Sequence, residues 1–382
     1  MRRVFCRLGG RTKRFDVRFL AILVATPLVA ASSPALAQCA AITGSVSGGC
    51  GLTAPSQVLT IQSGGTLNGW VNMTAAAPGA ELTVDAGGTL NAVHGTPPLN
   101  GSAQAVNTIV GLSGANQILT NNGTITFNQN ANADLIGATG DGFTITNNGQ
   151  IINNNTVNVS NAISINAANV SGTINNHGLI TAAGGGSEGT IFSSQNGGSL
   201  VINNFQGATI HSNSFVSVNI TGSKTTTLRN AGTISTNSLV VPAIQFGTGD
   251  DTLILESSSV ITGFVNGRSG VNTFALGGAT SGSFDVSLIG AAAQYRNFQT
   301  FEKIESSTWT LTGTTAAVTP WTITQGTLQI SDDNNLGALS GGVTLNGGTL
   351  ASIGPLSSAR TINLGASGGT VRTDADMTFS GV

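Results

Sequence analysis

The feature that most constrains the fold is a motif of asparagine, glycine and a short apolar run that returns five times. The copies begin at Asn121, Asn147, Asn175, Asn203 and Arg229 and end at Ile125, Ile151, Ile180, Ile210 and Ile234. Counted from the first residue of each copy, the steps are 26, 28, 28 and 26 residues. A period of this size is typical of a repeat architecture and not of a compact domain.

A shorter motif extends the repeat in both directions. Gly-Gly-Thr-Leu occurs at 64–67 and 87–90, and related motifs occur at 325–328, 347–350 and 368–371. These patterns divide the chain into an N-terminal cap with the first coils at 38–104, Asn-rich repeats at 105–244 and a third segment at 245–382. Residues 1–37 are set apart as a targeting segment.

Composition favours stacked β-structure. Charged residues make up 8% of the chain, against about a quarter in ordinary globular proteins, so Asn, Thr, Ser and Gly must cover the surface. We expect the glycines and asparagines to serve in turns that tolerate positive φ. Disorder is disfavoured because hydrophobic residues reach 40% and return in strand-length runs.

Each copy carries a short strand with alternating apolar residues, such as 124–127 and 200–202. A strand this short buries its apolar face only when successive copies stack in parallel, about 4.8 Å apart. Copies of about 20–28 residues suit one coil of a three-sided β-solenoid, in which corner asparagines can form stacked ladders. Helices are excluded by the lack of helical periodicity, and a propeller, the stronger competitor, needs longer blades and more aromatics.

The N-terminus has the pattern of a signal peptide. Seven basic residues precede or adjoin the apolar run 19–31, and Ala35-Leu36-Ala37 matches a small-x-small cleavage site. We expect cleavage after Ala37. The remaining chain has 7 basic and 15 acidic residues, a net charge of −8, which disfavours nucleic acid as a partner.

Cysteine usage indicates a staple at the new N-terminus. Cys6 leaves with the signal, so Cys39 and Cys50 are the pair that remains. In an oxidising compartment they could close a small disulfide loop. Lipid modification of Cys39 is the alternative, although Gln38 fits poorly with the small residue that such processing requires before the cysteine.

A family resemblance enters at residues 287–351. The runs 287–298, 301–303 and 307–313 resemble the passenger region of bacterial autotransporters, and 321–323, 326–330 and 345–350 resemble the passenger-associated transport repeat of those proteins. The resemblance implies that the fold is a right-handed parallel β-helix and that 245–382 is passenger. It also implies Sec-dependent export and passage through the outer membrane of a Gram-negative bacterium by a C-terminal β-barrel translocator.

We find no sequence pattern for that barrel after the repeats, and Val382 falls inside an expected coil. The expectation is therefore a passenger fragment or truncated product. Its location would be the cell surface, the outer membrane or the extracellular space, or the periplasm if no barrel is supplied.

One motif has the character of a metal site. Residues 247–253, Gly-Thr-Gly-Asp-Asp-Thr-Leu, fit one unit of a calcium-binding nonapeptide repeat, and 270–274 echo it 21 residues later with Asn in place of Asp. Calcium needs six or more oxygen ligands, so a turn that leads into a strand at 252–255 is the favoured interpretation. The sequence assigns no metal and no cofactor.

Catalytic residues are not assigned either. A glycan-active enzyme needs converging carboxylates, and the close acidic pairs are Asp250/Asp251, Glu302/Glu305, Asp332/Asp333 and Asp374/Asp376. We interpret the adjacent pairs as turns and Glu302/Glu305 as a solvated edge. His177 and His211 are placed in repeat turns, away from any serine-nucleophile motif. The aromatics Tyr295, Phe298, Phe301, Trp309 and Trp321 are expected in the core.

The sequence thus predicts an exported, non-catalytic β-helix stalk for surface display, adhesion or cell–cell contact. Its expected partners are the translocator barrel and surface glycans or proteins of host or bacterial cells. A β-helix polysaccharide-active enzyme or a carbohydrate-binding module remains the alternative.

Overall fold

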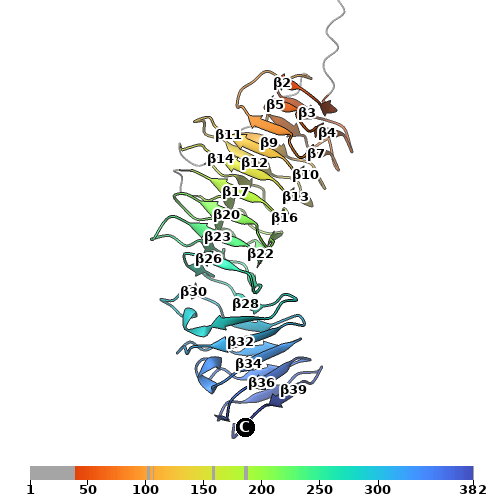
Figure 1. The fold of residues 1–382 in the computed structure, drawn as a ribbon. Coiled ribbons are helices and arrows are strands. Elements are labelled where there is room, and N and C mark those ends of the chain that lie inside the picture. Colours follow the sequence, from red (N-terminus) through yellow and green to blue (C-terminus); the bar gives the residue numbers. More distant parts are fainter. Residues whose placement is uncertain (1–38, 101–103, 106, 157–159, 185–187, 382) are drawn as a thin grey trace, which may run out of the picture. The chain divides into compact units, whose positions relative to one another are not determined.

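The chain folds into a right-handed parallel β-helix (Figure 1). The computed structural model describes residues 39–100, 104–105, 107–156, 160–184 and 188–381. In these residues each coil contributes one strand to each of several long sheets, and every strand pairs in parallel with its counterpart in the next coil. The all-β repeat fold predicted from the sequence is confirmed. The expected signal peptide lies outside the described residues.

Sheet one runs through all the described coils. Its 14 strands in the described residues stack in the order in which the chain visits them. They are β1 (Ala41–Ile42), β4 (Val58–Ile61), β7 (Glu81–Val84), β10 (Ile118–Asn121), β13 (Phe143–Asn147), β16 (Gly172–Asn176), β19 (Ser199–Asn204), β22 (Thr225–Asn230), β25 (Thr252–Leu255), β28 (Thr273–Leu276), β31 (Thr300–Lys303), β33 (Trp321–Ile323), β35 (Val343–Leu345) and β38 (Ile362–Leu364).

Sheets two and three form the other sides of the N-terminal and central coils. Sheet two contains β2 (Ser45–Ser47), β5 (Thr66–Gly69), β8 (Thr89–Ala92), β11 (Thr124–Phe127), β14 (Gln150–Asn153), β17 (Leu179–Ala182), β20 (Thr209–Ser212), β23 (Thr233–Thr236) and β26 (Val260–Thr262). Sheet three contains β3 (Cys50–Leu52), β6 (Val71–Met73), β9 (Thr108–Leu112), β12 (Asp134–Ala138), β15 (Ile163–Ile165), β18 (Ile191–Ser193), β21 (Val218–Ile220), β24 (Ile244–Gln245), β27 (Val265–Asn266) and β30 (Tyr295–Arg296).

The stack changes sheets near residue 270. Sheet two ends at β26, and sheet four takes over with β29 (Gly282–Asp285), β32 (Thr308–Thr312), β34 (Thr327–Ile330), β36 (Thr349–Ser352) and β39 (Thr370–Thr373). The strands β37 (Leu356–Ser358) and β40 (Met377–Phe379) form a separate pair, and two short 3-10 helices, η1 (Val286–Leu288) and η2 (Asp333–Leu336), lie between strands. Among the described residues β26 and β29 belong to different sheets, a discontinuity that we call the sheet break.

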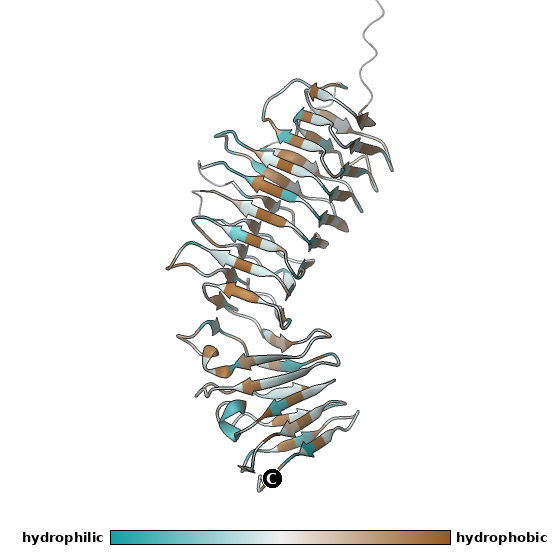
Figure 2. Ribbon diagram, in the orientation of Figure 1, coloured by the Kyte–Doolittle hydropathy of each residue, from teal (hydrophilic) through white to brown (hydrophobic). Residues whose placement is uncertain are grey.

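In-register pairing builds the core from columns of like residues. On sheet two the register places Ile125 over Leu90 and under Ile151, and Ile180, Ile210 and Ile234 continue the column. All six side chains are fully buried, while the threonines between them face outward and are half-buried. Figure 2 shows the resulting alternation of hydrophobic and polar residues along the strands. Burial of each such aliphatic side chain contributes about 1.5–3 kcal/mol.

An asparagine ladder runs inside sheet one parallel to these columns. The side chains of Asn121, Asn147, Asn176, Asn204 and Asn230 are buried, and each amide nitrogen donates to the amide oxygen of the next asparagine at 2.7–2.8 Å. The second hydrogen of each donating amide goes to a backbone carbonyl one coil further on, such as Gln150 O at 3.0 Å. The ladders expected from the Asn repeats are therefore present. The longest of those described is internal, and outward pairs such as Asn148 with Asn122 and Asn203 with Asn175 add bonds between coils.

The observed register corrects one step of the repeat. The ladder steps are 26, 29, 28 and 26 residues, because Asn147 pairs with Asn176 and not with Asn175. The sequence count aligned the first asparagine of each copy. The structure instead aligns the asparagine that precedes glycine by two positions in Asn121-Asn122-Gly123 and Asn176-His177-Gly178.

The expectation of positive φ is confirmed at several repeat glycines, such as Gly64, Gly87 and Gly207. Three glycines of the Asn-rich copies have a different role. Gly123, Gly149 and Gly178 do not have positive φ, so these turns do not need glycine for its backbone freedom. A Cβ on Gly149 would lie 2.0 Å from Gly123 O, and one on Gly178 would lie 2.0 Å from Gly149 O. Glycine is therefore required because successive coils approach each other too closely for any side chain.

We predict that Asn176→Ala destabilises the protein by about 2–4 kcal/mol, because it leaves the Asn147 amide and the Thr209 carbonyl without their buried partners. The measurement is the midpoint of urea unfolding followed by circular dichroism. The control is Asn175→Ala, which removes only the outer contact with Asn203 and should shift the midpoint by less than a quarter as much. Equal shifts for the two variants would contradict an internal ladder that bears on stability.

Candidate functional site

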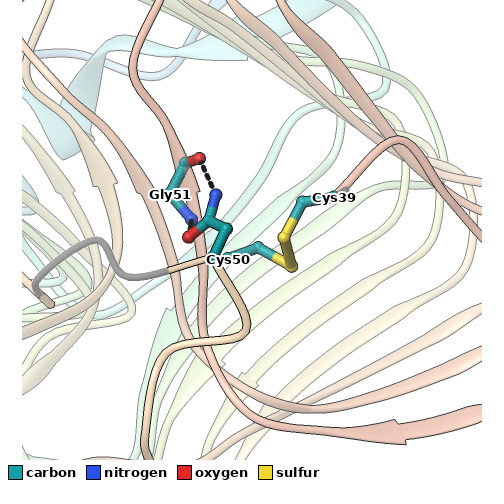
Figure 3. The surroundings of a disulfide bond; sticks show 4 residues. Cys39, Cys50 and Gly51 are labelled. Atoms are coloured by element: carbon teal, nitrogen blue, oxygen red, sulfur yellow. Dashed lines mark hydrogen bonds between the residues drawn. A yellow bond between two sulfur atoms is a disulfide. The ribbon is translucent and has the colours of Figure 1, made fainter. Parts of the chain in front are cut away.

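The first coil is closed by the disulfide that the sequence predicts. Cys39 and Cys50 are bonded, with their Cα atoms 5.7 Å apart (Figure 3). Cys50 is fully buried in β3. The side chain of Asn100 holds the next residue, because its amide donates to Gly51 O at 2.5 Å and its oxygen accepts from Gly51 N at 3.2 Å. The N-terminal end of the described coils is thus fixed both covalently and by backbone hydrogen bonds.

The calcium-like motif at 247–253 forms a turn. Asp251 is fully buried and its carboxylate accepts from Thr226 N at 2.7 Å and Gly247 N at 3.2 Å. Burial raises its pKa to about 6. Asp250 accepts from Val271 N at 2.7 Å. The turn leads into β25, as the sequence indicated, and its carboxylate oxygens are occupied by backbone amides.

The echo of this motif at 270–274 lies directly beneath it. Phe274 pairs with Leu253 across 21 residues. Asn272 is fully buried and accepts from Asp251 N at 3.0 Å while donating to Gly267 O at 2.8 Å. An aspartate and an asparagine in successive coils therefore fasten two adjacent turns.

The sequence predicts a solvated edge around Glu302 and Glu305, and this prediction is wrong for the residue between them. Lys303, which lies between them, is fully buried at the sheet-one position that asparagine occupies earlier. Its ammonium donates to the carbonyls of Ile304 and Glu305, both at 2.6 Å. Burial lowers the pKa of Lys303 to about 8. The long aliphatic stem fills the core while the turn carbonyls solvate the charge.

Glu305 belongs to an ion network that joins three coils. The Arg229 guanidinium contacts Glu305 at 2.6 Å and Glu256 at 2.8 Å. These bonds raise the pKa of Arg229, and the bond from Arg229 lowers the pKa of Glu305. The network lies next to the sheet break, because Glu256 directly follows β25.

The two remaining acidic pairs have separate roles. Asp332 caps η2 by accepting from Asn334 N at 2.8 Å, which makes this segment the predicted turn. Asp333 pairs with Arg360 at 3.2 Å, and this arginine is buried. Asp374 and Asp376 are both exposed near the C-terminal end of the described residues.

Four of the five aromatic residues predicted for the core are buried there, and the fifth, Phe298, is partly buried against it. Trp321 and Phe301 are 0% and 1% exposed and pack together at 5.5 Å between ring centroids, while Trp309 and Tyr295 are 3% and 6% exposed. His177 lies in a turn as expected and stacks on Phe205 at 3.9 Å. His211 lies within β20 and not in a turn, where its ring bonds Ser235 at 2.8 Å.

The sequence did not predict a cluster of two half-buried carboxylates around a buried asparagine. Asn161 is fully buried, and its amide nitrogen donates to Asp134 at 2.9 Å and to Glu188 at 2.8 Å. Burial is the main cause that raises the pKa of Asp134 to about 6, and the charge of Glu188 adds to it. These residues are about 27 positions apart, so only the coil register brings them together.

A cleft lies at the sheet break. Its volume is about 320 Å³, and two segments supply most of its lining. The segment around β26 contributes Leu255, Glu256, Ser257, Ser259, Val260 and Ile261, and the segment of β29 and η1 contributes Ser283, Phe284, Asp285 and Leu288. Gln294, Tyr295 and Trp309 complete its lining. Volumes of this size are at the lower end of small-ligand sites. The sequence did not predict this cleft. Its lining comes from residues of separate coils that share no motif, although the asparagine motif of sheet one also ends here, at Asn230, which pairs with Leu255.

The described residues can be judged for two further features, metal-binding groups and membrane-spanning helices. Among them no group of three or more His, Cys, Asp or Glu side chains is arranged to hold a metal ion. In the same part of the chain no helix has the length and apolar character needed to cross a membrane.

The Asp134 cluster predicts a pH dependence of stability. The folded pKa of about 6 lies above the ordinary 3.8, so its stabilising contribution is complete below about pH 4 and is lost as the pH rises through about 6. Asp134→Asn keeps an oxygen for Asn161 and removes the charge. We expect the free energy of unfolding of this variant, measured in urea, to equal that of the wild type near pH 4. Near pH 7.5 it should exceed the wild-type value by up to about 3 kcal/mol.

The matched control for this change is Asp374→Asn, which neutralises an exposed aspartate and should leave stability unchanged at both pH values. A wild-type advantage over Asp134→Asn near pH 7.5 would contradict the raised pKa.

Comparison with known protein families gives the relationship of the chain. Residues 72–283 match the family model of the BigA third pectate lyase-like domain. The match covers more than half of the 382 residues, and the chain therefore belongs to this family. It supports a β-helix region of the passenger type. No curated protein and no solved structure matches the chain.

Proposed function

We propose that this member of the BigA third pectate lyase-like domain family is an exported, non-catalytic stalk that displays a β-helix at the cell surface for adhesion or cell–cell contact. BigA itself is an autotransporter-like bacterial surface protein, and the family relationship supports a surface β-helix here. The finer roles of display and adhesion are our proposal.

The observation that carries the proposal is how the carboxylates are used. Asp250, Asp251 and Asp332 accept backbone amides at turns, and Glu256 and Glu305 are bound to Arg229. Groups that an enzyme would direct at a substrate are here engaged in holding coils together. What faces outward along the strands is chiefly Thr, Ser and Asn, a surface suited to contact and not to reaction.

Two features near the N-terminus support export from the cytoplasm. The basic and apolar N-terminal segment followed by Ala35-Leu36-Ala37 supports Sec-dependent export, and a disulfide between Cys39 and Cys50 is stable in an oxidising compartment. An outer-membrane β-barrel translocator is the partner this route requires. The destination would be the cell surface or the medium.

One loop has the character of an adhesive contact. Between β23 and β24 the adjacent residues Leu239 and Val240 are 97% and 85% exposed. Large apolar side chains this exposed contribute nothing to the fold and are favourable once a partner covers them. We propose that this apolar tip contributes to binding a cell-surface protein or glycan.

A polysaccharide-active enzyme is the second candidate. It is favoured by the cleft at the sheet break, which has both Glu256 and Asp285 in its lining. Against it, Glu256 is paired with Arg229 and Asp285 accepts from Ser287 N at 2.9 Å. Release of reducing ends from a panel of neutral and acidic polysaccharides, abolished by Asp285→Asn, would establish this candidate in place of the stalk.

The export proposal predicts the N-terminus of the secreted chain. Expression of the full chain in a Gram-negative host should give a product outside the cytoplasm that begins at Gln38, as read by N-terminal sequencing. Ala37→Asp should block processing, because the cleavage site requires a small residue, whereas Ser33→Asp should not. Recovery of the chain from the cytoplasm with residues 1–37 intact would refute this route.

The adhesion proposal predicts a loss of cell binding when the apolar tip is removed. Beads coated with the protein should bind host or bacterial cells, and Leu239→Ser with Val240→Ser should reduce the bound fraction at least threefold without changing thermal stability. The matched control is Val318→Ser with Leu339→Ser, which removes two apolar residues that are 52% and 55% exposed elsewhere. Equal adhesion of all three proteins would exclude the tip, and no adhesion of the wild type would exclude the function.

A further inference from the structure

We infer that the cleft at the sheet break binds a neutral sugar unit of a glycan chain. This inference rests on the proposed adhesive function and names a ligand class for it. The cleft lies where the outer wall of the solenoid changes from sheet two to sheet four, between β26 and β29. Sheet one itself continues past the cleft, because β25, β28 and β31 pair strand to strand.

The cleft contains a hydrogen-bond donor that no described residue uses. Tyr295 is 6% exposed, and its ring packs against Phe274 at 5.1 Å and Phe284 at 5.6 Å between centroids. Among the described residues its hydroxyl has no hydrogen-bond partner, although Tyr295 lines the cleft. The hydroxyl oxygen is not one of the fully buried polar atoms that lack a partner in the described residues, so it is open to the cleft and free to donate to a ligand there. Burial also raises the pKa of Tyr295, so this group remains a donor at neutral pH.

The residues that face this donor supply hydrogen-bond acceptors. The Gln294 amide nitrogen donates to Ile261 O at 2.7 Å and to Gly263 O at 3.0 Å. Its two hydrogens are thereby used, and its oxygen is left to accept. The carboxylates of Glu256 and Asp285 and the hydroxyls of Ser257, Ser259 and Ser283 add further acceptors to the lining.

Apolar surface adjoins these polar groups. Trp309 is fixed because its indole nitrogen donates to Gly277 O at 3.0 Å, and it lines the cleft together with Phe284 and Leu288. A Cβ on Gly282 would lie 3.1 Å from the Trp309 ring and 3.0 Å from Ser257 Cβ, so glycine keeps the space between the two edges open. A ligand with hydroxyls and apolar C–H faces in close alternation fits such a lining, and a sugar has both.

Charge decides which sugars fit. None of the described lining residues is Lys, Arg or His, whereas two are carboxylates. Of the cations nearby, Arg229 is already bound to Glu256 and Glu305, and Arg296 donates to Ala293 O and lies over the Phe264 ring. A uronate or other acidic sugar would bring a negative charge next to two carboxylates without a counter-charge. Neutral sugars are therefore preferred.

An extended peptide that adds a strand at the break is the competing occupant. Such binding requires open backbone groups along an edge strand. The carbonyls of Ile261 and Gly263, in and next to β26, are already bonded by Gln294. This edge is therefore partly closed to a peptide, and the side-chain donors and acceptors favour a sugar.

The test measures binding of the full chain to glucose, galactose, mannose and N-acetylglucosamine and their short oligomers, with galacturonate oligomers in parallel. Saturation-transfer NMR identifies binders and calorimetric titration gives the dissociation constant. We expect saturable binding of at least one neutral sugar and at least tenfold weaker binding of galacturonate oligomers. Tyr295→Phe should weaken the neutral sugar about tenfold while leaving the thermal unfolding midpoint unchanged or raised.

A second variant tests whether the sugar occupies the cleft itself, independently of any indirect effect of Tyr295→Phe. Ser283 is an exposed residue of β29 that lines the cleft, and Ser283→Phe should block the sugar. Thr314→Phe places the same ring at an exposed residue outside the lining and should bind like the wild type.

Each outcome decides the inference. It is overturned if no neutral sugar saturates at millimolar concentration, if galacturonate binds equally well, if Ser283→Phe and Thr314→Phe behave alike, or if a strand-forming peptide competes with the sugar. Loss of sugar binding with bead adhesion retained would refute this cleft alone. Sugar binding without adhesion would refute the proposed function and leave the cleft as a binding site.

Discussion

In-register parallel stacking is the constraint on which the rest of this structure depends. Because each strand pairs residue for residue with its counterpart one coil away, whatever one coil places at an inward position must suit the same position in its neighbours. An isoleucine can stack on an isoleucine at little cost, but a buried amide is tolerated only if the next coil supplies an acceptor. The ladder from Asn121 to Asn230 meets this condition because an asparagine recurs at the same inward position in five successive coils. The repeat in the sequence follows from this requirement.

The same constraint explains what happens where the ladder ends. Asn230 pairs with Leu255 in the next coil, and Leu276 and Lys303 follow. The last ladder amide turns to Gly232 O and Ser259 instead of to another asparagine. The column then becomes aliphatic, until Lys303 restores a buried donor that serves turn carbonyls. The sheet break lies in this stretch, where the asparagine ladder is interrupted while sheet one continues.

Sequence alone could predict the stacking because periodicity records it. The Asn-x-Gly copies and the Gly-Gly-Thr-Leu copies each mark one strand per coil, and the strands at 66–69, 89–92 and 124–127 begin where those motifs place them. The sequence could not predict the sheet break or the Asp134 cluster, because both depend on residues that are unremarkable in their own coil. Asp134, Asn161 and Glu188 share no motif, and only the register of β12 with β15 brings the first two together. The purpose of Gly149 was misjudged for the same reason, since the atom that excludes a side chain belongs to the coil before it.

The scarcity of charge has a physical consequence for the outer surface. Of the seven basic residues beyond residue 37, three, namely Lys224, Lys303 and Arg360, are buried and donate to backbone carbonyls. A fourth, Arg229, is bound to two glutamates, and Arg296 lies over the Phe264 ring at 3.9 Å. Most of the positive charge therefore holds turns together and is unavailable to a partner. Contacts made by the outer faces must consequently be short-ranged, through hydroxyls, amides and isolated apolar residues, and should depend little on salt.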